Sequence, residues 1–320
     1  MRAHLARRTG KLPLKVAHYG KNDPDTYRGG VESFARNLRL IFEDVVFMHA
    51  GHLDVDRVRS ERRMVICDNQ WVIDWPEDIP VVGFQHGVAA VKAKATGNKS
   101  ARQLALAQSR AAKRPNTLWV ACAEWIADAF EGRHGTGAKL VIYHHVDLER
   151  FDGARTGHDP RLVLHDARGR HKGKAEVAAL AARFQDWKLE PLACPPDDVS
   201  NRMREARAFL HVSRYEGNSI VCNEAMAMDL PLFATRVGLM QDSQRPQDVF
   251  LVDADQAFRD SQYLEGQFAR FLQSLESREY HPRGWVLEHA HLDVVRERWR
   301  QVAASWDAMM RQSPGVWRTP

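Results

Sequence analysis

Two glutamates and a glycine-containing turn give residues 213–238 the most specific chemistry in the chain. The segment reads Ser-Arg-Tyr-Glu-Gly-Asn-Ser-Ile-Val-Cys-Asn-Glu-Ala-Met-Ala-Met-Asp-Leu-Pro-Leu-Phe-Ala-Thr-Arg-Val-Gly. Gly217 allows a tight turn after a strand, and Ser219 can cap the helix that follows. Free N–H groups at such a helix start bind anions, and Glu224, about a turn and a half further on, can accept hydrogen bonds from hydroxyls. The pattern predicts a binding site for a ligand that carries hydroxyl groups beside a phosphate. The alternative is a capped surface helix on which Glu216 and Glu224 are merely solvated.

A second group of charged residues lies between positions 168 and 174, which read Arg-Gly-Arg-His-Lys-Gly-Lys. Fixed cations stabilise a diphosphate as its charge develops during bond cleavage. Arg168, Arg170 and Lys172 are cations that could act in this way. A solvated basic turn is the alternative.

Short apolar runs alternate with helical stretches in both halves of the chain, which predicts an α/β protein with parallel sheets. A polar, glycine-bearing stretch at residues 152–160 indicates a linker between the halves. The expected strands are 14–19, 45–48, 64–67, 81–84, 117–122, 139–143, 161–165, 189–194, 208–212, 231–235 and 249–252. The expected helices are 31–42, 100–113, 174–184, 197–206, 220–228 and a long C-terminal one at 286–310.

The order Glu-Gly, Glu-Ala-Met-Ala, Leu-Pro and Val-Gly across residues 213–238 resembles the signature of retaining glycosyltransferases of the family 4 type. This resemblance implies the GT-B fold, in which two Rossmann-like domains with parallel sheets face an interdomain cleft. It assigns residues 1–155 to an acceptor-side domain and 156–285 to a nucleotide-sugar-binding domain. It also implies that a C-terminal helix at 286–320 packs back on the first domain.

Weaker matches to the same family follow in the expected order. Gly29-Gly30 resembles its N-terminal glycine loop, and Phe84-Gln85-His86-Gly87 resembles the segment whose histidine lines the donor-sugar site. A lone histidine is otherwise more often structural. The resemblance implies catalytic roles for His86, Glu216, Arg168 and Lys172. It implies donor-binding roles for Gly29, Gly30, Gly217, Asn218, Ser219, Ile220 and Glu224, with Glu216 on the sugar hydroxyls and Glu224 on the ribose.

The implied reaction moves a sugar from a UDP- or GDP-sugar to a hydroxyl of a glycan or lipid-linked acceptor, with retention of configuration and no cofactor. Cell-surface polysaccharide or glycolipid synthesis is the implied setting. Two Asp-x-Asp triplets, at 54–56 and 253–255, lack the context of a metal site, so we assign no metal. A sugar-nucleotide epimerase on the same architecture is an alternative. A protein that binds nucleic acid or another anionic surface is a further one.

The balance of charged residues indicates which kinds of partner the chain could bind. Lys plus Arg is 46 and Asp plus Glu is 41, which leaves a net charge of +5. From Lys92 to Arg114 there are seven cations and no acid, on a stretch that predicts a mildly amphipathic helix. We expect this stretch to meet an anionic membrane surface or acceptor, with a solvated helix face as the alternative. No nucleic-acid motif accompanies it, so nucleic acid is not the expected partner.

The cysteines and the N-terminus bear on the location. Four widely spaced cysteines predict reduced thiols. The basic N-terminus lacks the apolar core of a signal peptide. The expected location is the cytoplasm, including the inner face of the membrane.

Overall fold

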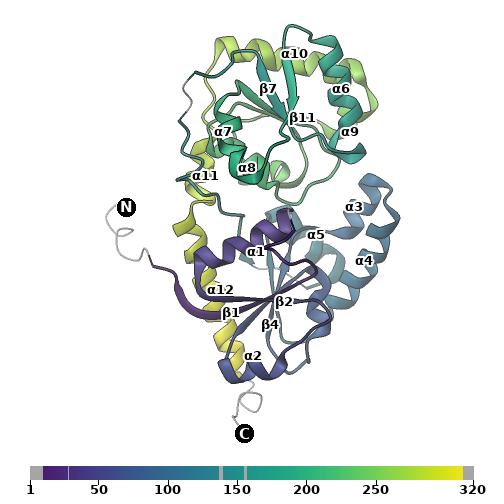
Figure 1. Ribbon diagram of the computed structural model, residues 1–320. Helices are drawn as coiled ribbons and strands as arrows, with labels where there is room; N and C mark the ends of the chain where they lie inside the picture. Colours follow the sequence, from purple (N-terminus) through teal and green to yellow (C-terminus); the bar gives the residue numbers. More distant parts are fainter. Residues whose placement is uncertain (1–9, 28, 137–139, 155–156, 313–320) are drawn as a thin grey trace. The chain divides into compact units, whose positions relative to one another are not determined.

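The computed structural model describes residues 10–27, 29–136, 140–154 and 157–312 (Figure 1). These residues form two compact units. The first contains the chain up to Ala90, Lys99–His145 and the chain from Leu292 onward. The second contains Val91–Asn98 and Val146–His291. The predicted boundary between residues 155 and 156 lies outside the described residues.

The sheet of the first unit has six parallel strands in the order β2-β1-β3-β4-β5-β6. Strands β3 and β4 are buried along their whole length, as their continuous apolar runs predict. The carboxyl ends of all six strands lie at one edge, because the strands run in one direction. The bounds are β1 Leu12–Gly20, β2 Phe42–His49, β3 Met64–Asp68, β4 Val81–Gln85, β5 Thr117–Ala121 and β6 Leu140–Val141.

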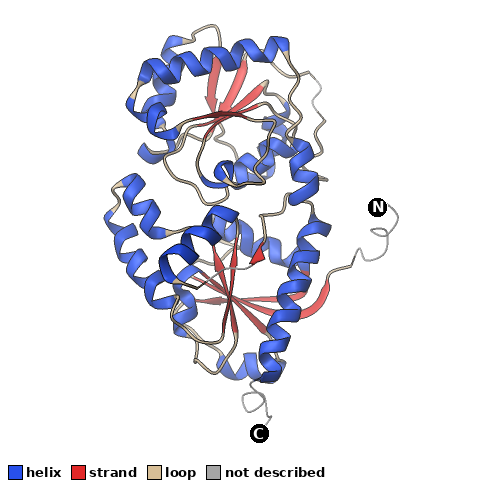
Figure 2. Ribbon diagram, turned by 180° about the vertical axis from the view of Figure 1, so that it is seen from behind, coloured by secondary structure: helices blue, strands red, loops and turns tan. Residues whose placement is uncertain are grey.

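Helices flank this sheet (Figure 2). The C-terminal helix α12, Leu292–Gln312, packs on it through Trp299, which is fully buried and stacks on Phe84 with ring centroids 5.9 Å apart. Trp306 of the same helix donates its indole N–H to the carbonyl of Pro80 at 3.1 Å. The other helices are α1 Gly30–Ile41, α2 Val55–Glu61, η1 Asn69–Asp74, α4 Lys99–Ala111 and α5 Glu124–His134; α3, Ala89–Thr96, spans the division between the units.

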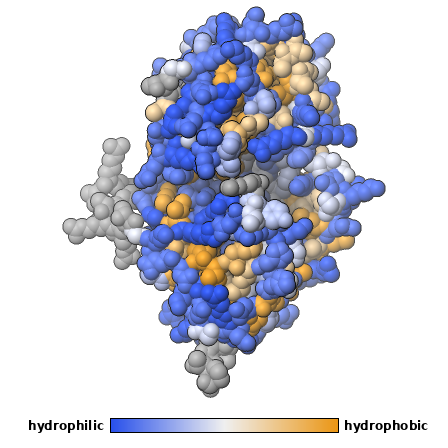
Figure 3. Space-filling model, viewed as in Figure 1, coloured by the Kyte–Doolittle hydropathy of each residue, from blue (hydrophilic) through white to orange (hydrophobic). Residues whose placement is uncertain are grey.

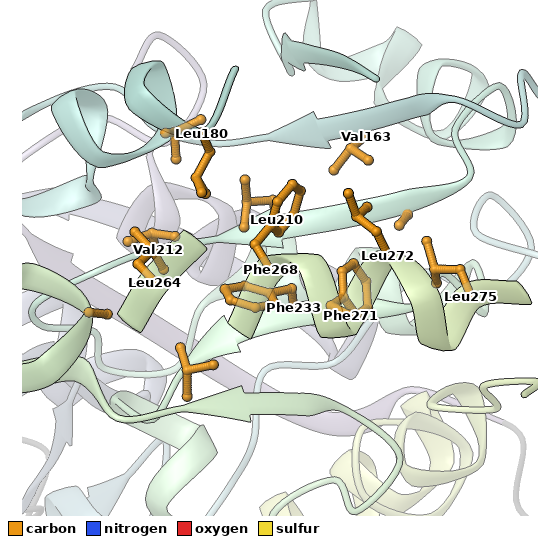
Figure 4. Close-up of a cluster of buried hydrophobic side chains, with 14 of the residues drawn as sticks. Val163, Leu180, Leu210, Val212, Phe233, Leu264, Phe268, Phe271, Leu272 and Leu275 are labelled. Atoms are coloured by element: carbon orange, nitrogen blue, oxygen red, sulfur yellow. The ribbon is translucent and has the colours of Figure 1, made fainter. Parts of the chain in front are cut away.

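The second unit has five parallel strands in the order β11-β10-β9-β7-β8. Its core is rich in phenylalanine: Phe268 and Phe271 of α10 pack against Phe233 of β10 (Figure 4). The strands are β7 Leu162–His165, β8 Lys188–Pro191, β9 Ala208–His211, β10 Leu232–Thr235 and β11 Phe250–Val252. The helices are η2 Arg170–Lys172, α6 Lys174–Arg183, η3 Pro196–Asp198, α7 Val199–Arg204, α8 Ile220–Ala227, η4 Gly238–Gln241, α9 Ala254–Arg259, α10 Ser261–Ser277 and α11 Arg283–His289.

The stretch 286–310 is helical as predicted, but it is divided into two helices instead of forming one. Helix α11 ends at His289 and α12 begins at Leu292, and the two belong to different units. The carbonyl of Ala290 accepts a hydrogen bond from the backbone N–H of Val146 at 3.2 Å instead of continuing the helical pattern. The spacing of apolar residues cannot predict such a long-range backbone hydrogen bond.

Only some of the cations between Lys92 and Arg114 are exposed on the surface. Arg114 is 8% exposed, and its guanidinium donates to the backbone carbonyls of Pro76 and Ile79, so it is a structural residue. The other cations of α4 and its end, Lys99, Arg102, Arg110 and Lys113, are exposed.

The face of the molecule seen in Figure 3 is largely hydrophilic. Among the described residues, no helix combines the length and apolar character that a membrane crossing requires.

Candidate functional site

The carboxyl ends of β7, β9 and β10 bring the charged residues of the second unit together. These strands are neighbours, so the segments that follow them meet at one edge of the sheet. Asp166 follows β7, residues 213–216 follow β9, and Gly238 comes shortly after β10. Segments from three distant parts of the sequence therefore build one site.

Backbone hydrogen bonds fix the turn that carries Lys172. The carbonyl of His171 accepts from the backbone N–H of Arg214 at 2.8 Å and from the hydroxyl of Ser213 at 3.2 Å. Gly173 has φ +64, and a Cβ there would lie 2.6 Å from the carbonyl oxygen of Val212. Only glycine fits at that position, and the result is that Lys172 faces the end of β9.

Lys172 binds two carboxylates. Its Nζ lies 2.6 Å from Glu216 Oε1 and 3.2 Å from Asp166 Oδ2. Burial opposes the charge of Lys172, but Glu216 and Asp166 raise its pKa above the ordinary value. The predicted pair Glu216 and Lys172 is therefore in direct contact, and its members hold each other in place.

His211, the last residue of β9, completes this cluster. Its Nδ1 lies 2.7 Å from Asp166 Oδ1, its Nε2 lies 3.5 Å from Glu216 Oε1, and the residue is 1% exposed. Burial alone would lower the pKa of His211, but Asp166 and the Cys222 thiol raise it well above the ordinary value. Burial likewise would raise the pKa of Asp166, but His211 and Lys172 lower it strongly. The favoured state is an imidazolium beside a carboxylate.

Glycine at position 238 lets the turn after β10 approach Glu216. Gly238 has φ +60, and a Cβ there would lie 2.7 Å from both Glu216 Cβ and the carbonyl oxygen of Gly217. Gly217, in contrast, has no positive φ. The strict requirement for glycine thus falls on Gly238 of the Val-Gly pair.

Helix α8 carries Glu224, whose side chain is half-buried and has no hydrogen bond or ion pair with any residue that the structure describes. Burial raises its pKa to about 7, and the charge of Arg150 opposes this effect. A carboxylate that has lost water without gaining a partner can accept hydrogen bonds from ligand hydroxyls.

The start of α8 differs in one respect from the sequence prediction. Ser219 takes the N-cap position, but its side chain makes no capping hydrogen bond. Instead, the Asn223 side-chain amide donates to Asn218 Oδ1 at 2.9 Å, and this contact shapes the turn. Ile220 is the first residue of the helix.

Arg168 lies outside the charged cluster. It is exposed in the turn between β7 and η2, where no ion pair or hydrogen bond of its side chain is found among the described residues. Its role on a diphosphate stays a prediction, as does the choice between it and the equally exposed Arg170.

The first unit has a separate charged cluster at the carboxyl ends of β1, β3 and β4. His86 Nε2 lies 2.8 Å from Asp68 Oδ1, and His18 Nε2 lies 3.1 Å from the same oxygen. Burial would raise the pKa of Asp68, but His18 and His86 lower it strongly. His86 also stacks on His144, with ring centroids 5.7 Å apart. The predicted site histidine is therefore held by a buried carboxylate.

Gly29 and Gly30 form the start of helix α1 in the first unit. Gly29 is the N-cap residue and Gly30 the first helical residue, and both are exposed. The carboxylate of Glu32 lies over Gly29, where a Cβ would be 2.3 Å from Glu32 Oε2. Asn22 fixes this carboxylate with a hydrogen bond of 2.7 Å. An acidic group therefore lies beside the turn, and the donor-binding role of Gly29 and Gly30 stays a prediction.

Comparison with known proteins shows how widely this architecture occurs. Residues 169–262 match the family model described as "Glycosyl transferases group 1". No curated protein sequence matches the chain. Sucrose-phosphate synthase from Thermosynechococcus elongatus is a similar structure, with a TM-score of 0.66 at 14% identity over 92% of this chain and 89% of that one. Anabaena HepE in complex with UDP-glucose gives a TM-score of 0.65 at 14% identity over 90% of this chain and 99% of that one. The lipopolysaccharide outer core galactosyltransferase WaaB gives 0.59 at 12% identity over 91% and 99%.

The chain has the GT-B fold. Two sheets of parallel strands with flanking helices match GT-B structures over nine-tenths of the chain. The family-model match contains Lys172, Glu216 and Glu224. It supports a GT-B glycosyltransferase, while assignment to family 4 stays a prediction.

The residues that sequence reasoning missed in these two charged clusters include Asp166, His211 and Asp68. Each lies at the carboxyl end of a strand or directly after it. In an open parallel sheet, ligands bind beyond the carboxyl ends of the strands. A polar residue that ends an apolar run was therefore the signal that could have found them.

Proposed function

We propose that this protein is a glycosyltransferase that moves a sugar from a nucleotide-diphosphate-sugar donor to a hydroxyl acceptor. The observation that carries the proposal is a pair of carboxylates on the second unit that can accept hydrogen bonds from the donor. Glu216 is fixed through Oε1 by Lys172, and Glu224 lies one helix turn beyond the same loop without a partner among the described residues. Two carboxylates at the ends of a glycine-containing turn suit a ligand with hydroxyl groups on both sides of a phosphate.

In the proposed reaction, Glu224 accepts hydrogen bonds from the ribose hydroxyls and Glu216 from the donor-sugar hydroxyls. The bond between the anomeric carbon and the diphosphate oxygen breaks, and the diphosphate leaves with the electron pair. Lys172 and Arg168 stabilise its charge. The acceptor oxygen bonds to the anomeric carbon, and the leaving diphosphate takes the acceptor's proton. The resemblance gives His86 a further role at the donor sugar.

The finer features of the proposal come from the resemblance of residues 213–238 to family 4 enzymes. They are retention of configuration, independence of metal, and a glycan or lipid-linked acceptor. We propose that the nucleotide of the donor is UDP, since HepE is described in complex with UDP-glucose. Lys99, Arg102 and Arg110 of α4 and Lys113 after it are exposed, as is Leu106 at 68%. We propose that α4 and its end meet an anionic membrane surface.

A thermal-shift panel of UDP-, GDP- and ADP-sugars tests the proposal and identifies the nucleotide. We expect one nucleotide class to raise the melting temperature, and Glu216→Ala and Lys172→Ala to abolish that rise and the sugar transfer. Lys174→Ala is the matched control, because Lys174 is an exposed lysine two residues away. Transfer that persists in both site variants would overturn the assignment of the site.

Incubation of the protein with donor alone separates transfer from the epimerase alternative. A transferase leaves the donor sugar unchanged until an acceptor is added, whereas an epimerase releases an altered sugar without one. Salt-dependent DNA binding with no response to any nucleotide sugar would instead favour the anionic-surface alternative.

A further inference from the structure

Asp166, His211, Glu216 and Lys172 form a closed ring of charged side chains. Asp166 contacts both His211 and Lys172, and these two cations both face Glu216 Oε1. Oε1 is buried, whereas Glu216 Oε2 has no partner among the described residues. The ring therefore fixes one oxygen of the carboxylate and leaves the other for a ligand.

The charge of this ring depends on His211. With His211 protonated, two carboxylates face two cations and the charges cancel. With His211 neutral, Lys172 alone would face both Asp166 and Glu216. A net negative charge would then lie at the place where a diphosphate must bind, and the ammonium of Lys172 would be held more firmly by its own carboxylates.

We propose that His211, oriented by Asp166, is a positioning residue for the donor: its imidazolium balances the carboxylates so that Lys172 can attract the diphosphate and Glu216 can hold the sugar. This inference rests on the proposed function. The groups that face His211 from the surrounding elements are Asp166 after β7, Lys172 in η2, Glu216 after β9 and Cys222 on α8.

Binding of UDP measured by calorimetry between pH 6 and pH 9 tests the proposal. For His211→Gln, we expect affinity to fall roughly tenfold or more, as for a lost charge-assisted contact, and to lose its alkaline decline. For Asp166→Asn, the alkaline decline should move to lower pH, because the carboxylate no longer holds the proton on His211. His281→Gln removes an exposed histidine of the same unit and should bind as the wild type does.

A purely structural role for His211 would weaken binding equally at every pH and would not shift the profile in Asp166→Asn. That result overturns the inference and leaves the proposed function standing. Failure of the wild type to bind UDP, GDP or any nucleotide sugar would overturn the proposed function itself.

The protonation state of His211 can also be measured in the wild type itself. In the wild type labelled with ¹⁵N-histidine, the His211 imidazole should carry protons on both nitrogens at pH 7.5, with Asp166→Asn used for assignment. A neutral ring at that pH would overturn the inference even if nucleotide binding is intact.

Discussion

The half-buried carboxylate of Glu224 makes the stability of the free protein depend on pH in an unusual direction. Its pKa rises from 4.5 to about 7 on folding, because burial disfavours the charge. Between these values the folded protein binds more protons than the unfolded chain, so stability falls as pH rises. Glu224→Gln removes the charge and keeps the shape, and it should therefore stabilise the protein above pH 7.

The expected size follows from the difference between the two pKa values. At about 1.4 kcal/mol per pKa unit, the ionised carboxylate costs roughly 3 kcal/mol at pH 8 and less than about 1 kcal/mol at pH 5. For a unit of this size, roughly 3 kcal/mol corresponds to a rise of about 6–12 °C in melting temperature. The same variant should bind UDP roughly tenfold or more weakly, because a charged hydrogen-bond acceptor is lost.

Scanning calorimetry of the wild type and Glu224→Gln at pH 5 and pH 8 provides the measurement. Glu276→Gln, on the exposed side of α10, is the control and should change neither value. If Glu224→Gln fails to stabilise the protein at pH 8, or stabilises it equally at pH 5, then Glu224 has a solvent or protein partner and the reasoning fails. Stabilisation with unchanged UDP binding would remove Glu224 from the ribose site.

Three further substitutions test the two charged clusters and the turn after β10. Lys172→Gln leaves His211 as the one cation of the cluster beside Asp166 and Glu216. It should lower the free energy of unfolding in urea by about 3 kcal/mol, whereas Lys174→Gln should change it by less than about 0.5 kcal/mol. Gly238→Ala should cost about 2–4 kcal/mol and reduce UDP binding, because its Cβ would enter the neighbouring turn; Gly266→Ala, with open space around it, should be neutral or stabilising. Asp68→Asn should lower the free energy of unfolding by about 2–3 kcal/mol at pH 7, with the loss shrinking below about pH 4, because the stability from a carboxylate with a lowered pKa disappears as pH falls. Equal losses at pH 3 and pH 7 would contradict this last assignment.

Much of the fold could be predicted because strands and helices follow from patterns of neighbouring residues. Nine of the eleven predicted strands have their main part in observed strands of the expected order, since a buried parallel strand is a short apolar run bounded by polar residues. Half of the prediction at 189–194 lies in β8. The strand predicted at 139–143 is observed only at Leu140–Val141, and residue 139 lies outside the described part of the chain. Helix α10 was missed, although Phe268, Phe271 and Leu275 give it an apolar face.

The site was predicted only in part, for a physical reason. The spacing of Glu216 and Glu224 is visible in one continuous segment, and the turn and helix between them form locally. The partners of Glu216 come from strands that are far apart in the sequence, and strand order alone makes them neighbours. Arg114 shows the opposite case, a cation that sequence placed on a surface and that folding buried among carbonyl groups.

The sequence by itself therefore determined the alternation of strands and helices, the glycine-containing turn before α8 and the types of side chain available for phosphate and hydroxyl binding. Only the tertiary structure decided which of these groups hold one another. Parallel strands bring their carboxyl ends to one edge, so Asp166 and His211 meet Lys172 and Glu216 there, and burial gives Glu224 its raised pKa. Burial and long-range ion pairing depend on the whole fold, and no local pattern of residues encodes them.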